Sequence, residues 1–201
     1  MTKNAVIYVF GLSDHRARGQ TLAVKTWRLY GVTPQVFHMY WHEPRPFADT
    51  LAKLLARIDE LVGKGYAVSL VGTSAGASVA IAAYAARPAT LHAVVCICGK
   101  LRNPETISPY TYRTNPAFRE SMAQTATNLE KLNPEQRSRI LSIRPVSDGL
   151  VPPADTVVSG AHHRRLYTRG HAFTIGYCVV LYAPFFLRFI KRLASRNESA
   201  S

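Results

Sequence analysis

The sequence contains little cysteine, which limits the kinds of site it can form. Its three cysteines are an odd number without a CxxC pair, a pattern that indicates neither a disulfide framework nor a four-cysteine metal site. Cys96 and Cys98 lie two residues apart in LHAVVCICG and therefore share one face of a strand, where we interpret them as packing residues. Reduced thiols are typical of the cytoplasm, the location we expect.

Neither a secretory leader nor a long apolar run is evident. The opening MTKNAVIYVF passes directly into strand-forming residues. An apolar stretch runs from Phe173 to Leu187, just before Arg188, and contains Gly176 and Pro184. It is shorter than the roughly 20 residues that a membrane-spanning helix needs. We therefore favour a last helix buried against a sheet over peripheral attachment to a membrane.

Acidic residues are also few, with 12 Asp and Glu against 25 Lys and Arg, giving a formal net charge of +13. The basic residues are scattered from Lys3 to Arg196 without a dense block, and no RNA- or DNA-binding motif accompanies them. Neither GxxxxGK[ST] nor GxGxxG is present, so the sequence has no phosphate-binding loop of those kinds. We expect a dispersed basic surface and no nucleic-acid partner.

What the sequence does contain is a regular alternation of strand and helix patterns. The expected strands are 5–10, 33–40, 67–71, 91–99, 139–145 and 164–169, and the expected helices are 20–31, 47–65, 75–87 and 172–195. This alternation predicts an α/β three-layer sandwich in which a mostly parallel sheet of about six strands is covered by helices on both faces. We predict one domain over residues 1–195, an irregular segment at about 100–135, and a polar tail at 196–201.

The stretch AVSLVGTSAGASVAIAAYAA places Ser74 at the corner between a buried strand and a helix, with Gly72 and Gly76 on either side. A strand that turns sharply into a helix at G-x-S-x-G exposes the serine hydroxyl, and glycine avoids collisions within the turn. The backbone N–H of Ala75 then points to the same space at a helix N-terminus. This is the geometry of a nucleophile, although a small residue in a tight turn is the simpler alternative.

A serine nucleophile needs a base and an acid, and both are expected after later strands. His171 is the histidine after Ser74 that directly follows a predicted strand, since His92, His162 and His163 lie at or before strand starts. Asp148 follows the fifth strand in RPVSDGLVP, and Asp155 is the weaker candidate for the acid. Either Asp148 or His171 alone could instead cap a turn or a helix.

The motifs GTSAG, SDGLVP and GHAF, each in its place relative to a strand or helix, resemble the α/β-hydrolase family over nearly the whole chain. The resemblance implies sheet order 2-1-3-4-5-6, with Ser74 as nucleophile, Asp148 as acid and His171 as base. It also implies a second oxyanion-binding amide in the loop FGLSDHRARG, from Leu12 or, as second choice, Ser13. The chain departs from the family by lacking the usual His-Gly pair before that amide and the two antiparallel strands that usually come first.

In that family order the connection after strand 1 leads to one side of the sheet and the connection after strand 3 leads to the other. A crevice is expected between these two connections, at the carboxyl ends of the strands. Residues 100–135 would then form a small cap above it, with side chains available to line an acyl or alcohol pocket or, equally, to form the cap's own core: Tyr110, Tyr112, Phe118 and Met122.

The sequence as a whole thus predicts a serine hydrolase of carboxylic esters or thioesters that acts on a small acyl substrate and needs no cofactor or metal. The alternatives are a non-catalytic relative that binds an anionic partner and a protein that binds a membrane surface. The oligomeric state is left open by the sequence.

Overall fold

The computed structural model describes residues 3–198 of the chain, with side chains described through residue 195. Six strands form one sheet in the order β2-β1-β3-β4-β5-β6, and every neighbouring pair is parallel. The strands are β1 (Lys3–Val9), β2 (Val32–Phe37), β3 (Tyr66–Thr73), β4 (Leu91–Ile97), β5 (Ile140–Ser147) and β6 (His162–Arg169). Both the parallel sheet and the strand order expected from the family resemblance are therefore confirmed.

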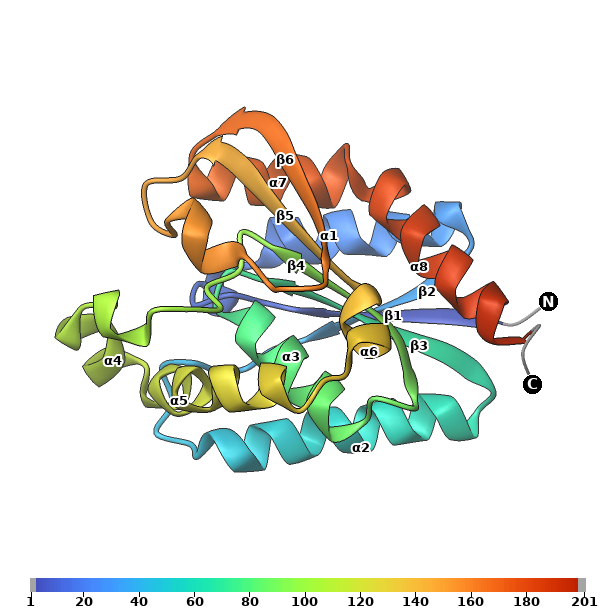
Figure 1. Ribbon diagram of the computed structural model, residues 1–201, viewed down its shortest axis with the longest axis horizontal. Helices are drawn as coiled ribbons and strands as arrows, with labels where there is room; N and C mark the ends of the chain where they lie inside the picture. The colour runs from blue at the N-terminus through green and yellow to red at the C-terminus, as the bar shows by residue number, and fades with distance from the viewer. Residues whose placement is uncertain (1–2, 199–201) are drawn as a thin grey trace.

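Helices cover both faces of this sheet and complete the three layers (Figure 1). One face carries α2 (Phe47–Gly63), α3 (Gly76–Ala86), α5 (Pro116–Glu130) and α6 (Pro134–Ser138). The other carries α1 (Arg18–Lys25), the 3-10 turn η2 (Thr26–Tyr30), α7 (His171–Val180) and α8 (Ala183–Glu198). Each layer closes its own apolar core, because the inner strands are buried on both faces and offer side chains to both sides.

The predicted helix 172–195 is two helices in the structure. Residues 181 and 182 separate α7 from α8, and the two axes are bent by 63°. Pro184 lies in the first turn of α8, where its missing N–H is tolerated, whereas inside a continuous helix it would remove a hydrogen bond. In the part of the chain that the structure describes, no single helix is long and apolar enough to cross a membrane, although α7 and α8 reach that length and composition together.

The predicted cap at 100–135 divides into two parts. Its first part holds the short 3-10 turn η3 (Pro104–Thr106) and α4 (Pro109–Thr114), which projects beyond the end of the sheet (Figure 1). Its second part, α5, packs along α3 and α2 and belongs to the helical layer. Of the predicted tail at 196–201, residues 196–198 belong to α8, which continues to Glu198, and residues 199–201 lie outside the described residues.

Two glycines allow α3 to begin directly against the sheet. A Cβ added at Gly76 would lie 2.4 Å from the carbonyl oxygen of Val9, and one added at Gly72 would lie 2.4 Å from the carbonyl oxygen of Gly76. Backbone therefore packs on backbone at the carboxyl ends of β1 and β3, and any side chain would force the elements apart. This is the collision that the G-x-S-x-G spacing predicts.

We expect Gly72→Ala to lower the free energy of unfolding by about 3 kcal/mol or more, because its Cβ meets rigid backbone rather than a movable side chain. Urea unfolding followed by circular dichroism measures this loss. Gly63→Ala is the matched control, since a Cβ there meets nothing within 4 Å and should change stability by no more than about 1 kcal/mol. A Gly72→Ala protein as stable as the control would contradict the close packing described here.

Candidate active site

Ser74 occupies the corner between β3 and α3 in a backbone conformation that is rare for a residue with a side chain. Its φ is 52°, in the left-handed region, and its N–H donates to the carbonyl of Ile97 at 2.9 Å. Its own carbonyl accepts from the N–H of Ala77 at 3.1 Å, which closes the first turn of α3. Neighbouring elements therefore hold the strained turn, and the half-buried Ser74 side chain lines a cavity.

The loop after β1 lies directly against Ser74. A Cβ placed on Gly11 would be 3.0 Å from the Ser74 Cβ and 3.6 Å from its Oγ. Leu12, the next residue, lines the same cavity as Ser74, while Ala75 is buried at the start of α3. Among the described residues, neither the Leu12 N–H nor the Ala75 N–H has a hydrogen-bond partner. Backbone N–H groups without a partner are free to donate hydrogen bonds to an oxyanion.

Ser13, the second candidate for that amide, is exposed, and its carbonyl accepts from the N–H of Arg16 at 3.0 Å in the short 3-10 turn η1 (Asp14–Arg16). The buried Asp14 carboxylate accepts from the N–H of Tyr40 at 2.6 Å. This hydrogen bond ties the loop after β1 to the loop after β2. The backbone next to Leu12 is therefore anchored from the neighbouring strand.

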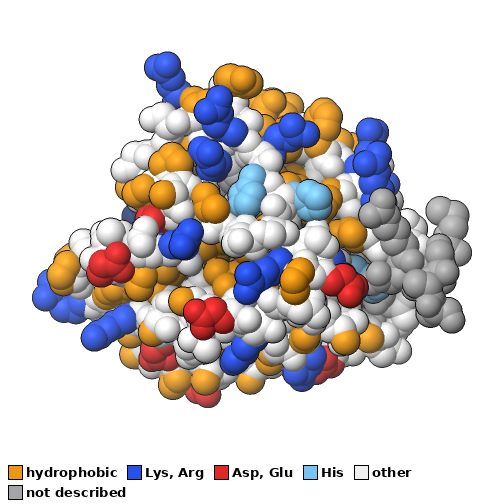
Figure 2. All heavy atoms as spheres, viewed as in Figure 1, with side chains coloured by type: hydrophobic (Ala, Val, Ile, Leu, Met, Phe, Trp, Pro, Cys, Tyr) orange, Lys and Arg blue, Asp and Glu red, His pale blue; other side chains and the backbone are white. Residues whose placement is uncertain are grey.

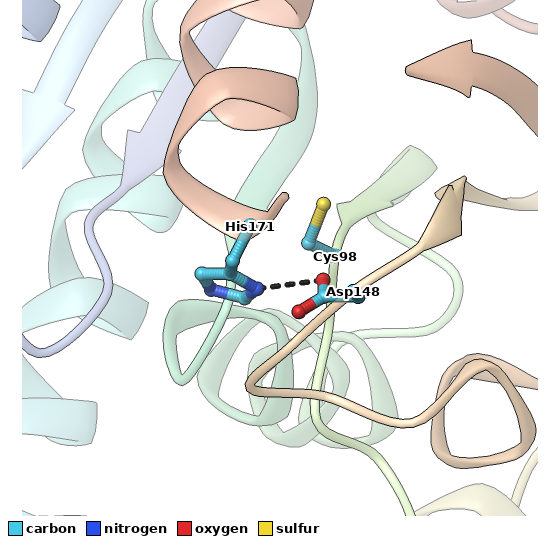
Figure 3. A group of neighbouring side chains, drawn as sticks. All are labelled: Cys98, Asp148 and His171. Carbon is cyan, nitrogen blue, oxygen red and sulfur yellow. Dashed lines mark hydrogen bonds and ion pairs between the residues drawn. The ribbon is translucent and has the colours of Figure 1, made fainter. Parts of the chain in front are cut away.

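Asp148 and His171 follow the carboxyl ends of β5 and β6, and their side chains point toward each other (Figure 3). The Nδ1 of His171, at the first position of α7, lies 2.8 Å from Oδ2 of Asp148. The other oxygen of Asp148 accepts from the N–H groups of Leu150 and Val151 at 2.8 and 3.0 Å. An ionised carboxylate only accepts hydrogen bonds, so Nδ1 is the donor in this pair, and in a neutral imidazole Nε2 then keeps its lone pair. The Asp148 side chain is 1% exposed, which strengthens this polar pair.

Cys98 is a third member of this cluster that the sequence interpretation treated only as a packing residue. Its Sγ and ligand atoms of Asp148 and His171 lie within 4.8 Å of one another, a spacing that could hold a metal ion (Figure 3). Burial, with the nearby Asp148 charge, raises the pKa of the Cys98 thiol and so disfavours the thiolate that binds metals. The sequence did offer one signal for this position: Cys98 directly follows β4, and residues that follow parallel strands, such as Ser74 and Asp148, lie at the same edge of the sheet.

The cavity beside Ser74 has a volume of about 320 Å³. Its apolar wall includes Ile107, Phe118, Leu150 and Val151, and Lys100 also borders it. Of the pocket residues expected from the sequence, only Phe118 lines it. Met122 lines a separate cavity, and Tyr110 is 67% exposed. Tyr112 packs against Phe118, with ring centroids 5.8 Å apart, and its hydroxyl donates to the carbonyl of Pro104.

Comparisons with known proteins agree with this architecture. No protein-family model matches the chain, and a comparison with curated proteins gives no significant match. Solved structures do match. Est1E from Butyrivibrio proteoclasticus has 16% identity and a TM-score of 0.70, with 94% of this chain and 89% of that chain covered. A structure described under the metagenome-derived lipolytic enzymes LipS and LipT has 15% identity and a TM-score of 0.67, with 95% and 94% covered. The monoacylglycerol lipase of Paleococcus ferrophilus has 13% identity and a TM-score of 0.57, with 97% and 96% covered.

The chain has the α/β-hydrolase fold. Coverage above nine-tenths of this chain and close to that of each neighbour extends the likeness over the complete sheet. In this fold Leu12 and Ser74 lie in the loops that follow the neighbouring strands β1 and β3. From β1 the chain crosses to β2 on one side of the sheet, and from β3 it crosses to β4 on the other side, so these two loops flank the point where the strand order reverses.

Within this α/β-hydrolase fold, Asp155 has a partner of its own. It is 1% exposed, pairs with the Nζ of Lys100 and accepts from the side-chain amide of Asn103. Lys100 also donates to the hydroxyl of Thr106 at 2.6 Å. Asp155, the weaker candidate for the acid, thus forms a buried ion pair with Lys100. This pair joins the loops after β4 and β5 at the cavity wall.

Other residues considered from the sequence are also engaged elsewhere. The hydroxyl of the buried Ser78 donates to the carbonyl of Ala75 at 2.8 Å and lies 2.5 Å from that of Ser121. His162 and His163 are the first residues of β6, at the opposite end from His171. The ring of His163 accepts from the N–H of Val158 at 3.2 Å, and burial lowers its pKa.

We expect Asp155→Asn to lower the free energy of unfolding by about 3 to 5 kcal/mol, because it leaves the Lys100 cation buried without a counter-charge. Asp59→Asn is the matched control: it breaks the exposed pair with Arg87, which water screens, and should leave the stability almost unchanged. Urea denaturation of both variants measures the difference. Equal losses would show that the buried pair does not hold these two loops together.

Proposed function

We propose that this chain is a serine hydrolase that cleaves carboxylic esters or thioesters through an acyl-enzyme. The observation that carries the proposal is the hydrogen bond between His171 and Asp148 at the edge of the sheet where Ser74 adopts its left-handed turn. The α/β-hydrolase fold, with esterases and lipases among its structural neighbours, supports hydrolysis as the reaction class. Ser74 is the proposed nucleophile, His171 the base and Asp148 the acid.

Attack begins when Nε2 of His171 takes the proton from the Ser74 hydroxyl as Oγ bonds to the substrate carbonyl carbon. Asp148 stabilises the imidazolium that forms, and the Leu150 and Val151 amides keep its carboxylate oriented. The carbonyl oxygen becomes an oxyanion and accepts hydrogen bonds from the N–H groups of Leu12 and Ala75.

The tetrahedral intermediate then collapses and breaks the bond to the alcohol or thiol. His171 returns its proton to this leaving group, and the acyl group remains on Ser74. Water attacks the ester carbon of the acyl-enzyme with His171 again as base, which releases the carboxylic acid and restores the Ser74 hydroxyl. All proton transfers in this cycle pass through one imidazole.

The cavity wall favours an uncharged acyl or alcohol group. Ile107, Phe118, Leu150 and Val151 present apolar surface beside Ser74, and burial of such a group against them contributes to binding. The Lys100 ammonium is neutralised by Asp155 and is therefore a weak attractor for an anionic substrate.

A metal centre at Cys98, Asp148 and His171 is the second candidate, favoured by their close spacing. It competes with the first candidate, because His171 and Asp148 would serve as metal ligands and not as the base and acid of a serine nucleophile. Both candidates predict a loss of activity when His171 or Asp148 is changed, so the distinguishing residues are Ser74 and Cys98.

A fluorophosphonate probe should label wild-type protein on Ser74, and Ser74→Ala should abolish both labelling and hydrolysis of p-nitrophenyl esters. Mass spectrometry of labelled peptides identifies the site. Ser78→Ala serves as the control. The Ser78 hydroxyl is buried and hydrogen-bonded, so its removal should leave labelling intact. Labelling on another serine would contradict the assignment, and absence of labelling and turnover would favour the non-catalytic relative that binds an anionic partner.

Asp148→Asn should reduce turnover by about ten thousandfold. The introduced side-chain amide lacks the negative charge that stabilises the imidazolium, and it favours the wrong tautomer of His171. His171→Ala should be similarly severe. The double variant should be hardly worse than either single variant, since members of one catalytic unit are not additive. Steady-state kinetics on one ester substrate tests all three, and multiplicative losses in the double variant would contradict a shared role.

Cys98→Ala separates the two candidates. It removes a ligand of the metal cluster and leaves the Ser74, His171 and Asp148 side chains unchanged, so the serine mechanism predicts turnover within a few fold of wild type. Treatment with a chelator should likewise leave turnover unchanged. Loss of activity in both experiments, restored by an added divalent metal, would favour the metal centre.

A further inference from the structure

The basic residues are scattered along the sequence, but the carboxylates are not scattered over the surface. Residues 15–42 and 156–195 contain no Asp or Glu, and these ranges include α1, η2, β6, α7 and α8 up to residue 195. The opposite helical layer carries several carboxylates, on α2, α5 and α6. In Figure 2 the upper part of the molecule, over β6, α7 and α8, shows Lys and Arg but no Asp or Glu.

On β6 and on α8 up to residue 195 there are six cations, and all are exposed: Arg164, Arg165, Arg169, Arg188, Lys191 and Arg192. No ion pair joins any of them to a carboxylate within residues 3–195. Their charges add to one positive field at this side of the molecule, which attracts a polyanionic partner.

The same side exposes large apolar side chains. Phe173 is 64% exposed, Leu181 64% and Phe185 60%. The rings of Phe173, Tyr177, Tyr182 and Phe185 follow one another in stacked contacts, with successive centroids 6.5, 6.3 and 4.8 Å apart. Isolated exposed apolar residues are ordinary, but a connected row bordered by arginines marks an interaction surface.

Two hollows run between this row and β6. One of about 550 Å³ is lined by Arg165, Tyr167, Phe173 and other residues of β6 and α7. A second of about 470 Å³ lies between β6 and α8 and includes Arg188 and Arg192. We call this surface, from Arg164 and Arg165 on β6 to Phe173, Phe185, Arg188 and Arg192 on α7 and α8, the aromatic–arginine face. It is distinct from the cavity beside Ser74.

We propose that the aromatic–arginine face binds the surface of an anionic lipid bilayer. Its arginines match the negative headgroups, and its exposed phenylalanines and Leu181 match the boundary between headgroups and acyl chains. The opposite sides of α7 and α8 are occupied, since Ile175, Phe186 and Ile190 pack against the sheet. The helices therefore lie along the membrane plane and do not insert across it.

The other occupants are less well matched. A second copy pairing through the free edge of β6 would bring the exposed Arg164 and Arg165 of both chains together, which opposes pairing. A nucleic acid would use arginines and stacked aromatic rings. It gains little from aliphatic Leu181 or from Leu22 and Leu29, which are 65% and 80% exposed on α1 and η2 in the same layer. The apolar part of the face thus favours lipid.

The chain offers a matched pair of variants for the test. The Arg165 guanidinium lies 5.9 Å from the centre of the Tyr167 ring on this face, and the Arg113 guanidinium lies at the same 5.9 Å from the Tyr110 ring on α4. Arg165→Glu/Tyr167→Ser and Arg113→Glu/Tyr110→Ser therefore make identical chemical changes in two places. Both are introduced into the Ser74→Ala protein, so that binding is measured without dependence on hydrolysis.

Binding is measured by flotation with vesicles of phosphatidylcholine alone or mixed with phosphatidylserine. We expect binding only with phosphatidylserine, weakened by added salt, and reduced about tenfold or more by Arg165→Glu/Tyr167→Ser because each basic residue near an anionic surface adds to the attraction. Arg113→Glu/Tyr110→Ser should bind like its parent. Thermal melting checks that both variants fold.

Three results would overturn the proposal. The first is absence of binding to phosphatidylserine vesicles at low salt. The second is an equal loss in the two matched variants. The third is salt-dependent binding to a single-stranded oligonucleotide without binding to vesicles, which would assign the face to nucleic acid. None of these outcomes bears on hydrolysis, which the fluorophosphonate experiment tests separately.

Discussion

The contact of backbone with backbone at the carboxyl ends of β1 and β3 is the constraint on which the site depends. Gly76 brings α3 against the carbonyl of Val9, and Gly72 lets the strand turn beneath it. Ser74 is consequently held in a left-handed conformation that a free chain would avoid. Because the sheet and α3 are fixed by buried packing on both sides, the strain at Ser74 cannot relax without disrupting the core.

At the other part of the candidate site, the hydrogen bonds of the Asp148 carboxylate fix the geometry, whereas close glycine packing fixes it at Ser74. Asp148 has one oxygen bound by two amides of its own turn and the other by His171, so its orientation and that of the imidazole are coupled. The buried pair of Lys100 and Asp155 joins the loops after β4 and β5 nearby. Loop geometry at this edge therefore rests on polar groups removed from water, whose loss is expensive.

The two helical layers of the molecule differ in charge as well as in packing. The layer with α2, α3 and α5 carries mixed charges and borders the cavity beside Ser74, whereas the layer with α7 and α8 presents the aromatic–arginine face. One helix connects the two proposed sites, because α7 begins with His171 and exposes Phe173 two residues later. A protein bound to lipid through this face would hold its proposed catalytic base close to the membrane.

The sequence by itself determined the parallel sheet and the turn at Ser74, because both depend on local patterns: continuous apolar strands between amphipathic helices, and glycines at fixed spacing. It also pointed to Asp148 and His171, since parallel strands deliver the residues that follow them to one edge. It could not determine that the last helix breaks before Pro184, because a proline in a first turn and one in a helix interior look alike in sequence.

The tertiary structure alone decided which side chains surround the site. Cys98 joins Asp148 and His171, Asp155 pairs with Lys100, and Phe118 reaches the cavity while Tyr110 remains exposed. The distribution of charge was equally hidden, because two acid-free segments far apart in the chain, residues 15–42 and 156–195, come together in one layer when α1 and η2 pack beside α7 and α8. These features join residues far apart in sequence, and the packing of whole elements sets their distances, which no local pattern encodes.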